Sequence, residues 1–206
     1  MTFVTLEGPD GAGKSTLSVG IKRELESMGF SVVALREPGS TPVGERVRAI
    51  LLDPAVGALD PMTEALLFSA CRSELVRTAI RPALAAGSIV LLDRYFDSTM
   101  AYQGAGGGAD PGALEALALA ATGGLIPDLT LVVDVSPNVS ARRRLTSPDR
   151  MEAKDHAYRA RVRESFLSLP NRRPGRAIVL NGESDREALV AESVAEIIKR
   201  IPRVIP

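Results

Sequence analysis

Short hydrophobic segments alternate with longer amphipathic segments along this chain. The short segments are apolar throughout, which is typical of buried strands. We expect five strands, over Phe3–Glu7, Ser31–Leu35, Ser88–Leu92, Leu129–Asp134 and Ala177–Leu180. Strands of this kind are usually covered by helices on both faces, as in parallel sheets. The pattern therefore predicts an α/β fold with a five-stranded parallel sheet and helices on both faces.

Helical periodicity occupies the segments between the strands. From Lys14 to Met28 apolar residues recur every three or four positions, and Gly29 follows as a natural helix end. Further helices are expected over Pro42–Leu52, Met62–Ala86, about Pro111–Thr122, Pro137–Leu145, Glu152–Leu167 and Arg186–Arg200. Pro82 should kink the long helix or separate its last turn. The glycine-rich stretch Gly104–Asp110 is expected to be mobile.

Composition narrows the class of protein. The chain has 206 residues, of which 45% are hydrophobic, and this suits one domain over residues 1–206. Its apolar runs are shorter than the roughly 18 residues of a membrane helix, and its first residues do not resemble a secretory signal. A single cysteine, Cys71, excludes an internal disulfide. We expect a protein of a reducing compartment with no membrane partner.

The charge balance and the cysteine and histidine content argue against nucleic-acid binding and against a zinc site. Lys+Arg and Asp+Glu both number 25, which argues against general binding to nucleic acid. With Cys71 and His156 as the only residues of their types, a zinc site built on cysteine or histidine is excluded. We therefore expect neither a nucleic-acid partner nor a structural zinc ion.

A phosphate-binding motif follows the first predicted strand and opens the first predicted helix. Gly8–Ser15 matches G-x-x-x-x-G-K-[ST] at every fixed position. Glycines let successive N–H groups point at phosphate oxygens, and the helix N-terminus adds partial positive charge. Lys14 should reach the β and γ phosphates, and the Ser15 hydroxyl should ligate Mg²⁺. The alternative is a chance match. The predicted nucleoside triphosphate site comprises Gly8, Pro9, Asp10, Gly11, Ala12, Gly13, Lys14, Ser15 and Thr16.

A carboxylate at the end of a neighbouring strand should complete the magnesium site. Asp93 ends the strand over Ser88–Leu92 and is our candidate, although a strand-end aspartate can simply cap the next turn. Asp134 ends another strand and is expected to cap the helix that begins near Pro137. Arg94 follows Asp93 and brings a cation to this site; without an acceptor phosphate it would pair with Asp93 or Asp97.

The sequence favours a small-molecule kinase over a nucleotide-dependent switch. It lacks the guanine-recognition motif N-K-x-D, and no D-x-x-G follows the second strand. Arginines cluster around residues 146–152, where they could neutralise charge between two phosphates; they are Arg142, Arg143, Arg144 and Arg150. The alternative is a solvated basic helix face.

Two pairs of residues indicate a pocket for a planar base. Phe68 and Arg72 are four apart on one predicted helix, where a ring could stack on a base and a guanidinium could bond its edge. By themselves they are more typical of a core Phe and a surface Arg. Thr99 and Gln103 are also four apart, and a glutamine amide both donates and accepts hydrogen bonds.

Seven blocks in order along the chain resemble the bacterial thymidylate kinase family. They are Gly8–Ser15, Arg36–Gly39, Leu67–Arg72, Asp93–Tyr95, Ala101–Gly104, Pro127–Leu131 and Asp149–Glu152. The resemblance covers nearly the whole chain, and the blocks from Asp93 to Gly104 are its most specific part. It implies a P-loop kinase fold with an arginine-rich lid over about 142–153. It also implies transfer of phosphate from ATP to dTMP with Mg²⁺, in a cytoplasmic homodimer.

The resemblance also implies roles for individual residues. Phe68 would stack on thymine, Arg72 and Gln103 would hydrogen-bond its edge, and Thr99 would lie beside it. Asp10 would meet the sugar 3′-hydroxyl, and Tyr102 would crowd C2′. The acceptor phosphate would be held by Arg94, Arg36 and Arg48, with the Glu37 carboxylate near the phosphates.

Catalysis would rest on Lys14, Arg94 and a lid arginine, either Arg144 or Arg150, because Gly11 stands where the eukaryotic type carries an arginine. Three alternatives stay open from the sequence. The chain could be another nucleoside monophosphate or deoxynucleoside kinase on the same fold, a P-loop switch, or an inactive scaffold.

Overall fold

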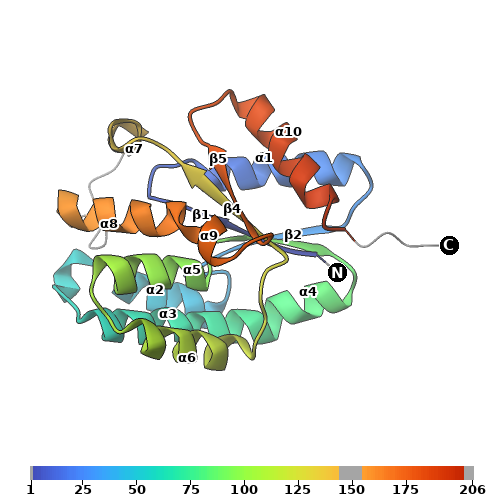
Figure 1. The fold of residues 1–206 in the computed structure, drawn as a ribbon. Helices are drawn as coiled ribbons and strands as arrows, with labels where there is room; N and C mark the ends of the chain where they lie inside the picture. Colours follow the sequence, from blue (N-terminus) through green and yellow to red (C-terminus); the bar gives the residue numbers. More distant parts are fainter. Residues whose placement is uncertain (1, 144–154, 202–206) are drawn as a thin grey trace.

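A computed structural model describes residues 2–143 and 155–201. Its strands form one parallel sheet in the order β2-β3-β1-β4-β5 (Figure 1). Their bounds are β1 Thr2–Glu7, β2 Val32–Arg36, β3 Ile89–Asp93, β4 Leu129–Asp134 and β5 Ala177–Asn181. The five predicted strands and their parallel arrangement are confirmed. The connection after β1 leads to β2 on one side of the sheet, and the connection after β3 leads to β4 on the other side of β1. A parallel sheet opens a crevice where neighbouring strands are followed by connections in opposite directions, which here is between β1 and β3.

Helices cover both faces of the sheet, as the apolar strands predicted. On one face α1 (Lys14–Ser27) and α10 (Arg186–Ile198) pack against each other and against β1, β3 and β4 (Figure 1). On the other face α3 (Pro61–Leu75) covers β1 and β3, and α8 (His156–Leu167) covers β4. The sheet core alternates accordingly, since Leu91 faces the first layer and Val90 and Leu92 face the second.

The remaining elements connect these layers. They are α2 Pro42–Leu52, η1 Pro54–Val56, η2 Val76–Ile80, α4 Arg81–Ala85, α5 Phe96–Thr99, η3 Met100–Gly106, α6 Pro111–Thr122, α7 Pro137–Arg143 and α9 Leu169–Arg172. The long helix predicted over Met62–Ala86 is divided into α3, the π-helical turn η2, and α4. Pro82 lies in the first turn of α4 and cannot donate a helical hydrogen bond, so the wide turn falls just before it.

The glycine-rich segment after α5 is more ordered than its composition predicted. Gly104 and Gly106 are buried in η3, although we expected them to be mobile. A Cβ on Gly106 would lie 2.7 Å from the Tyr158 ring of α8, so glycine is needed for this close packing. The Tyr158 hydroxyl donates to the Tyr102 carbonyl oxygen at 2.9 Å, and Arg161 donates to the carbonyls of residues 105 and 106. Side chains of α8 therefore cap this helical segment.

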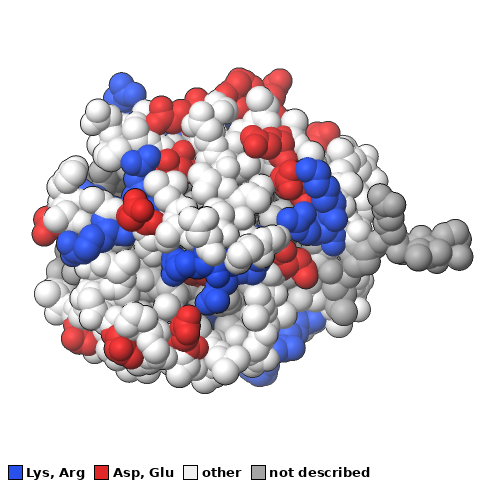
Figure 2. Space-filling view, in the orientation of Figure 1, with Lys and Arg blue, Asp and Glu red and all other residues white. Residues whose placement is uncertain are grey.

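Charged side chains of both signs are spread over the face seen in Figure 2. Basic clusters alternate there with acidic groups, in keeping with equal numbers of the two types in the sequence. Within the described ranges, no helix combines the length and apolar character needed to cross a membrane.

Candidate active site

The loop between β1 and α1 encloses the amine of Lys14. This lysine is buried, and its Nζ donates to the carbonyl oxygens of Gly8 at 3.1 Å and Pro9 at 2.9 Å. Burial, helped by the nearby Arg94 cation, lowers the pKa of Lys14 to about 8. Residues 10–17 of the loop and helix line a cavity of about 650 Å³, which we call the donor cavity.

Two glycines of this loop have no room for a side chain. Gly8 has φ +131°, and a Cβ there would lie 2.3 Å from the Val133 carbonyl oxygen. Gly11 has φ +75°, and a Cβ there would lie 2.6 Å from the Ser140 carbonyl oxygen. An arginine at position 11 would therefore require the backbone to move, which agrees with the absence of a loop arginine noted in the sequence.

Ser15 and Asp93, the predicted magnesium ligands, are in direct contact. The Ser15 hydroxyl donates to Asp93 Oδ2 at 2.7 Å. Asp93 Oδ1 is buried and accepts no hydrogen bond from the described part of the chain. No group of three or more His, Cys, Asp or Glu side chains suited to a metal occurs in the same part. A hydroxyl and one carboxylate fit Mg²⁺, which often takes its other ligands from phosphates and water.

Arg94 lies at the boundary of the site and pairs with the phosphate loop. Its Nη2 donates to Asp10 Oδ1 at 2.5 Å, and its Nη1 donates to the Gly8 carbonyl at 3.1 Å. The ring of Tyr102 lies under the guanidinium at 5.2 Å, and the Tyr102 hydroxyl donates to Asp10 Oδ2 at 2.8 Å. Asp10 is thus the partner of Arg94, in place of Asp93 or Asp97.

Glu7, which sequence reasoning missed, supports the turn that carries Arg94. Arg94 has φ +71°, an uncommon conformation for this residue type. The buried Glu7 carboxylate accepts from the Tyr95 N–H at 2.8 Å and from the Ser98 hydroxyl at 2.5 Å. Ser98 Oγ in turn accepts from Arg94 Nη1 at 3.1 Å. Burial, reinforced by the nearby Asp97 charge, raises the pKa of Glu7 to about 7.

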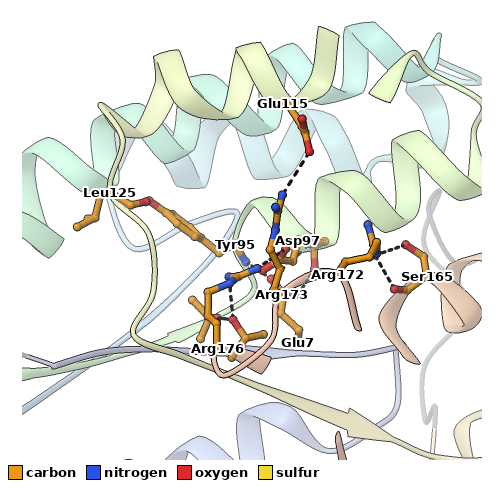
Figure 3. Close-up of polar contacts among 12 residues, drawn as sticks. Glu7, Tyr95, Asp97, Glu115, Leu125, Ser165, Arg172, Arg173 and Arg176 are labelled. Carbon is orange, nitrogen blue, oxygen red and sulfur yellow. Dashed lines mark hydrogen bonds and ion pairs between the residues drawn. The ribbon is translucent and has the colours of Figure 1, made fainter. Parts of the chain in front are cut away.

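A buried ion pair lies beneath this turn (Figure 3). Asp97 accepts from both terminal nitrogens of Arg176, at 2.8 and 3.0 Å, next to Glu7 and Tyr95. The Tyr95 hydroxyl donates to the Leu125 carbonyl at 3.2 Å. The carboxyl end of β3 is therefore fixed by groups from three other parts of the chain.

A second, smaller cavity of about 110 Å³ adjoins the donor cavity, and we call it the acceptor cavity. The predicted base-binding residues line it from two sides: Phe68 and Arg72 on α3, Thr99 on α5, and Tyr102 and Gln103 on η3. Arg72 is 1% exposed; its Nε donates to Glu37 Oε2 at 2.8 Å and its Nη2 to Thr99 Oγ1 at 3.2 Å. Arg72 Nη1 is buried without a partner in residues 2–143 and 155–201.

Four charged residues line both cavities. They are Asp10, Glu37, Arg48 and Arg94. Burial raises the pKa of Glu37 to about 7 despite the opposing Arg72 charge. Arg48 Nη1 donates to the Pro38 carbonyl at 3.0 Å. Arg36 lines only the donor cavity, where its half-exposed guanidinium pairs with both oxygens of Glu45 at 2.9 and 3.0 Å.

The arginine-rich region is described only in part. Arg144 and Arg150, our lid candidates, lie outside the described residues. Arg143 lines the donor cavity, and its Nη1 donates to the Gly182 carbonyl at 3.0 Å. The cavity also extends to Ser184 and Arg186.

The expected role of Asp134 is wrong. Its carboxylate does not cap α7 but accepts two hydrogen bonds from Arg163 of α8, both at 2.7 Å. The bidentate pair with a cation is stronger than a bond to a neutral N–H.

Comparison with known proteins gives consistent matches. A model of the thymidylate kinase family matches residues 6–193. A thymidylate kinase of Deinococcus radiodurans is 45% identical over 200 residues, which cover 96% of this chain and 97% of the relative. One of Thermomicrobium roseum is 46% identical over 204 residues, covering 96% of each. The crystal structure of thymidylate kinase from Ehrlichia chaffeensis superimposes with a TM-score of 0.76 at 31% identity, covering 94% of this chain and 96% of that one.

Proposed function

The chain belongs to the thymidylate kinase family, whose enzymes phosphorylate dTMP, and we propose that it uses ATP and Mg²⁺ to convert dTMP to dTDP. The observation that carries this proposal is that two cavities share four charged residues. The larger cavity is built around a phosphate loop, and the smaller one is lined by a ring and a buried guanidinium. Phosphate transfer between two nucleotides needs adjoining sites, so that the phosphates of donor and acceptor lie next to each other.

The donor cavity supplies the groups that hold a triphosphate. Backbone N–H groups of the loop and the N-terminus of α1 face the phosphates. Two loop carbonyls hold the Lys14 amine in place before nucleotide binds. Phosphate oxygens then keep that amine protonated, because an opposite charge favours the charged form. Arg143 and the segment from Gly182 to Arg186 provide the remainder of the wall, where we place the rest of ATP.

Ser15 and Asp93 would hold the Mg²⁺ ion, with the buried Asp93 Oδ1 as an available ligand atom. When bound, the ion neutralises charge on the transferring phosphate and orients it. Among the described residues, Asp93 is the one carboxylate we assign to this ion, so the affinity for the metal depends on the nucleotide phosphates.

The acceptor cavity positions dTMP through side chains. Phe68 offers a face for the base, and Arg72 Nη1 offers a donor without a partner in the described structure. Asp10, held between Arg94 and Tyr102, offers oxygens for the sugar hydroxyl. Arg94 and Arg48 lie where the two cavities meet and would hold the acceptor phosphate.

The chemistry then follows from positioning and charge. An acceptor phosphate oxygen is already anionic, so it needs no general base to attack the γ-phosphate. Lys14 and Arg94 neutralise the charge that spreads over the transferring group. Between turnovers Glu37 keeps Arg72 oriented, and Asp10 keeps Arg94 oriented. A further arginine, Arg144 or Arg150, is predicted to assist.

We further propose a homodimer that forms along the long helix α3. Large apolar side chains are exposed on it and on the two helices packed beside it: Leu66 on α3, Ile50 on α2 and Leu119 on α6 are 53%, 47% and 64% exposed. Sedimentation should give the dimer mass for the wild type and the monomer mass for Leu66→Asp. A wild-type monomer at micromolar concentration would refute this interface. A cytoplasmic location is implied by the family, and cell fractionation tests it.

A coupled ADP-release assay tests the function directly. The acceptors to compare are dTMP, dUMP, UMP, CMP, AMP, GMP and thymidine, each with ATP and Mg²⁺. We expect turnover that strongly prefers dTMP. Preference for another nucleotide would keep the kinase but refute the base assignment, and turnover independent of any acceptor would indicate a switch.

A further inference from the structure

Glu64 is a buried carboxylate to which the proposed mechanism assigns no role. It is 3% exposed and lies on α3, four residues before Phe68 and eight before Arg72. All three side chains therefore lie along one face of the helix. Burying a carboxylate is costly unless it is hydrogen-bonded, so the groups that bond to Glu64 hold it in place.

One hydrogen-bond partner of Glu64 is the amide of Gln103. Glu64 Oε2 accepts from Gln103 Nε2 at 3.0 Å, and both groups are buried. The contact joins α3 to η3, and the contact between Arg72 and Thr99 joins α3 to α5. The amide of Gln103 is thus held by a group outside the cavity lining.

This contact fixes which end of the Gln103 amide is available to a base. A carboxylate only accepts hydrogen bonds, so the NH₂ group must be turned toward Glu64. The carbonyl Oε1 is left as an acceptor, and in the described structure it has no hydrogen-bond donor of its own. Arg72, which lines the same cavity, has in Nη1 a donor without a partner among the described residues. Arg72 Nη1 and Gln103 Oε1 therefore give the cavity a donor and an acceptor in a fixed arrangement.

We propose that Glu64 is a positioning residue that makes the acceptor cavity select an imide base edge over an amino base edge. The proposal rests on the proposed function. Thymine and uracil present a carbonyl oxygen and an N3–H, which match the Arg72 donor and the Gln103 acceptor. Cytosine presents an amino group and an unprotonated N3, which oppose both. Selection therefore requires that the Gln103 amide cannot turn around.

The test replaces the carboxylate with its isosteric amide. Glu64→Gln can accept or donate, so Gln103 is free to present either end of its amide. We expect the ratio of kcat/KM for dTMP to that for dCMP to fall by about tenfold or more, through the KM values. The ratio for dTMP to dUMP should not change, because those bases share the imide edge and differ only in a methyl group. A merely structural defect would lower kcat/KM for dTMP, dCMP and dUMP alike. An unchanged dTMP-to-dCMP ratio would overturn the proposal.

Two controls isolate the role of Glu64. Glu74→Gln makes the same change further along α3, where Glu74 pairs with the exposed Arg77, and it should leave both ratios at the wild-type values. In a Gln103→Leu background, Glu64→Gln should have no further effect on either ratio, since no amide remains to be oriented. A full effect in that background would show that Glu64 does not act through Gln103.

A measurement on the wild-type protein covers the case in which the variant does not fold. A through-hydrogen-bond NMR coupling between the Gln103 amide nitrogen and the Glu64 carboxyl carbon should be present with dTMP bound, and its absence would overturn the proposal. Failure of the wild type to phosphorylate dTMP would instead refute the proposed function. The two failures are therefore distinguishable.

Discussion

The donor and acceptor cavities are built in different ways. The donor cavity depends mainly on one continuous loop, whose backbone carbonyls hold Lys14 and whose glycines allow close contacts. The acceptor cavity is assembled from side chains of α2, α3, α5 and η3, fixed by buried charge pairs such as Arg72 with Glu37. A backbone site can be recognised from a short motif, whereas a side-chain site depends on contacts between distant segments.

The largest effect is expected from Lys14→Ala in the donor cavity. Loss of the amine removes charge neutralisation in the transition state, so kcat should fall by about 10³-fold or more. Lys22→Ala, on the exposed side of α1, is the matched control and should retain wild-type activity. A fall confined to the KM for ATP would show that Lys14 acts in binding only.

The Arg72→Ala variant should affect the KM for dTMP and the KM for ATP differently. We expect the KM for dTMP to rise by about 100-fold, since a charged hydrogen-bond donor to the base is lost. The KM for ATP should not change, because Arg72 lines the acceptor cavity alone. Thermal stability should also fall, because Glu37 is left buried without its partner. Arg77→Ala, whose guanidinium is exposed, serves as the control; an equal rise in both KM values would contradict the division into two cavities.

The stability of the protein should depend on pH through Glu7, which holds the turn that carries Arg94. Its pKa is raised from 4.5 to about 7 in the folded protein, so the folded chain holds a proton that the unfolded chain releases between these values. Stability should therefore decrease as the pH rises through this window. Glu7→Gln mimics the protonated form and should be more stable than the wild type at pH 8, by up to roughly 3 kcal/mol, but not at pH 4. Parallel denaturation curves at the two pH values would show no such linkage.

The smallest effect is expected from Arg36→Ala at the exposed rim. Its pair with Glu45 is open to solvent, so thermal stability should hardly change. The KM for dTMP should rise only a few-fold, by roughly 2- to 5-fold, and less at high salt. A rise comparable to that of Arg72→Ala would place Arg36 directly on the acceptor.

These contrasts explain what the sequence could predict. The strands, the phosphate loop and the spacing of Phe68 and Arg72 depend on local patterns, and the structure places these residues as expected. Glu7 and Glu64 were missed because their partners are 91 and 39 residues away. A charged residue at the end of an apolar strand, and an acid one helical turn before Phe68, were the available signals.

The errors have a common physical cause. Gly104 and Gly106 suggested mobility by composition, yet their lack of side chains serves helix packing against Tyr158. Asp134 suggested a cap, yet Arg163 from a distant helix provides a stronger partner. In both cases tertiary contacts override the local preference.

The central claim is that the two cavities form one continuous site for phosphate transfer. Inhibition by a compound that joins adenosine and thymidine through a polyphosphate chain tests this most directly. The compound should compete with both ATP and dTMP, and should bind more tightly than ADP or dTMP alone because one molecule fills both cavities. Competition with only one of the two substrates would contradict the claim.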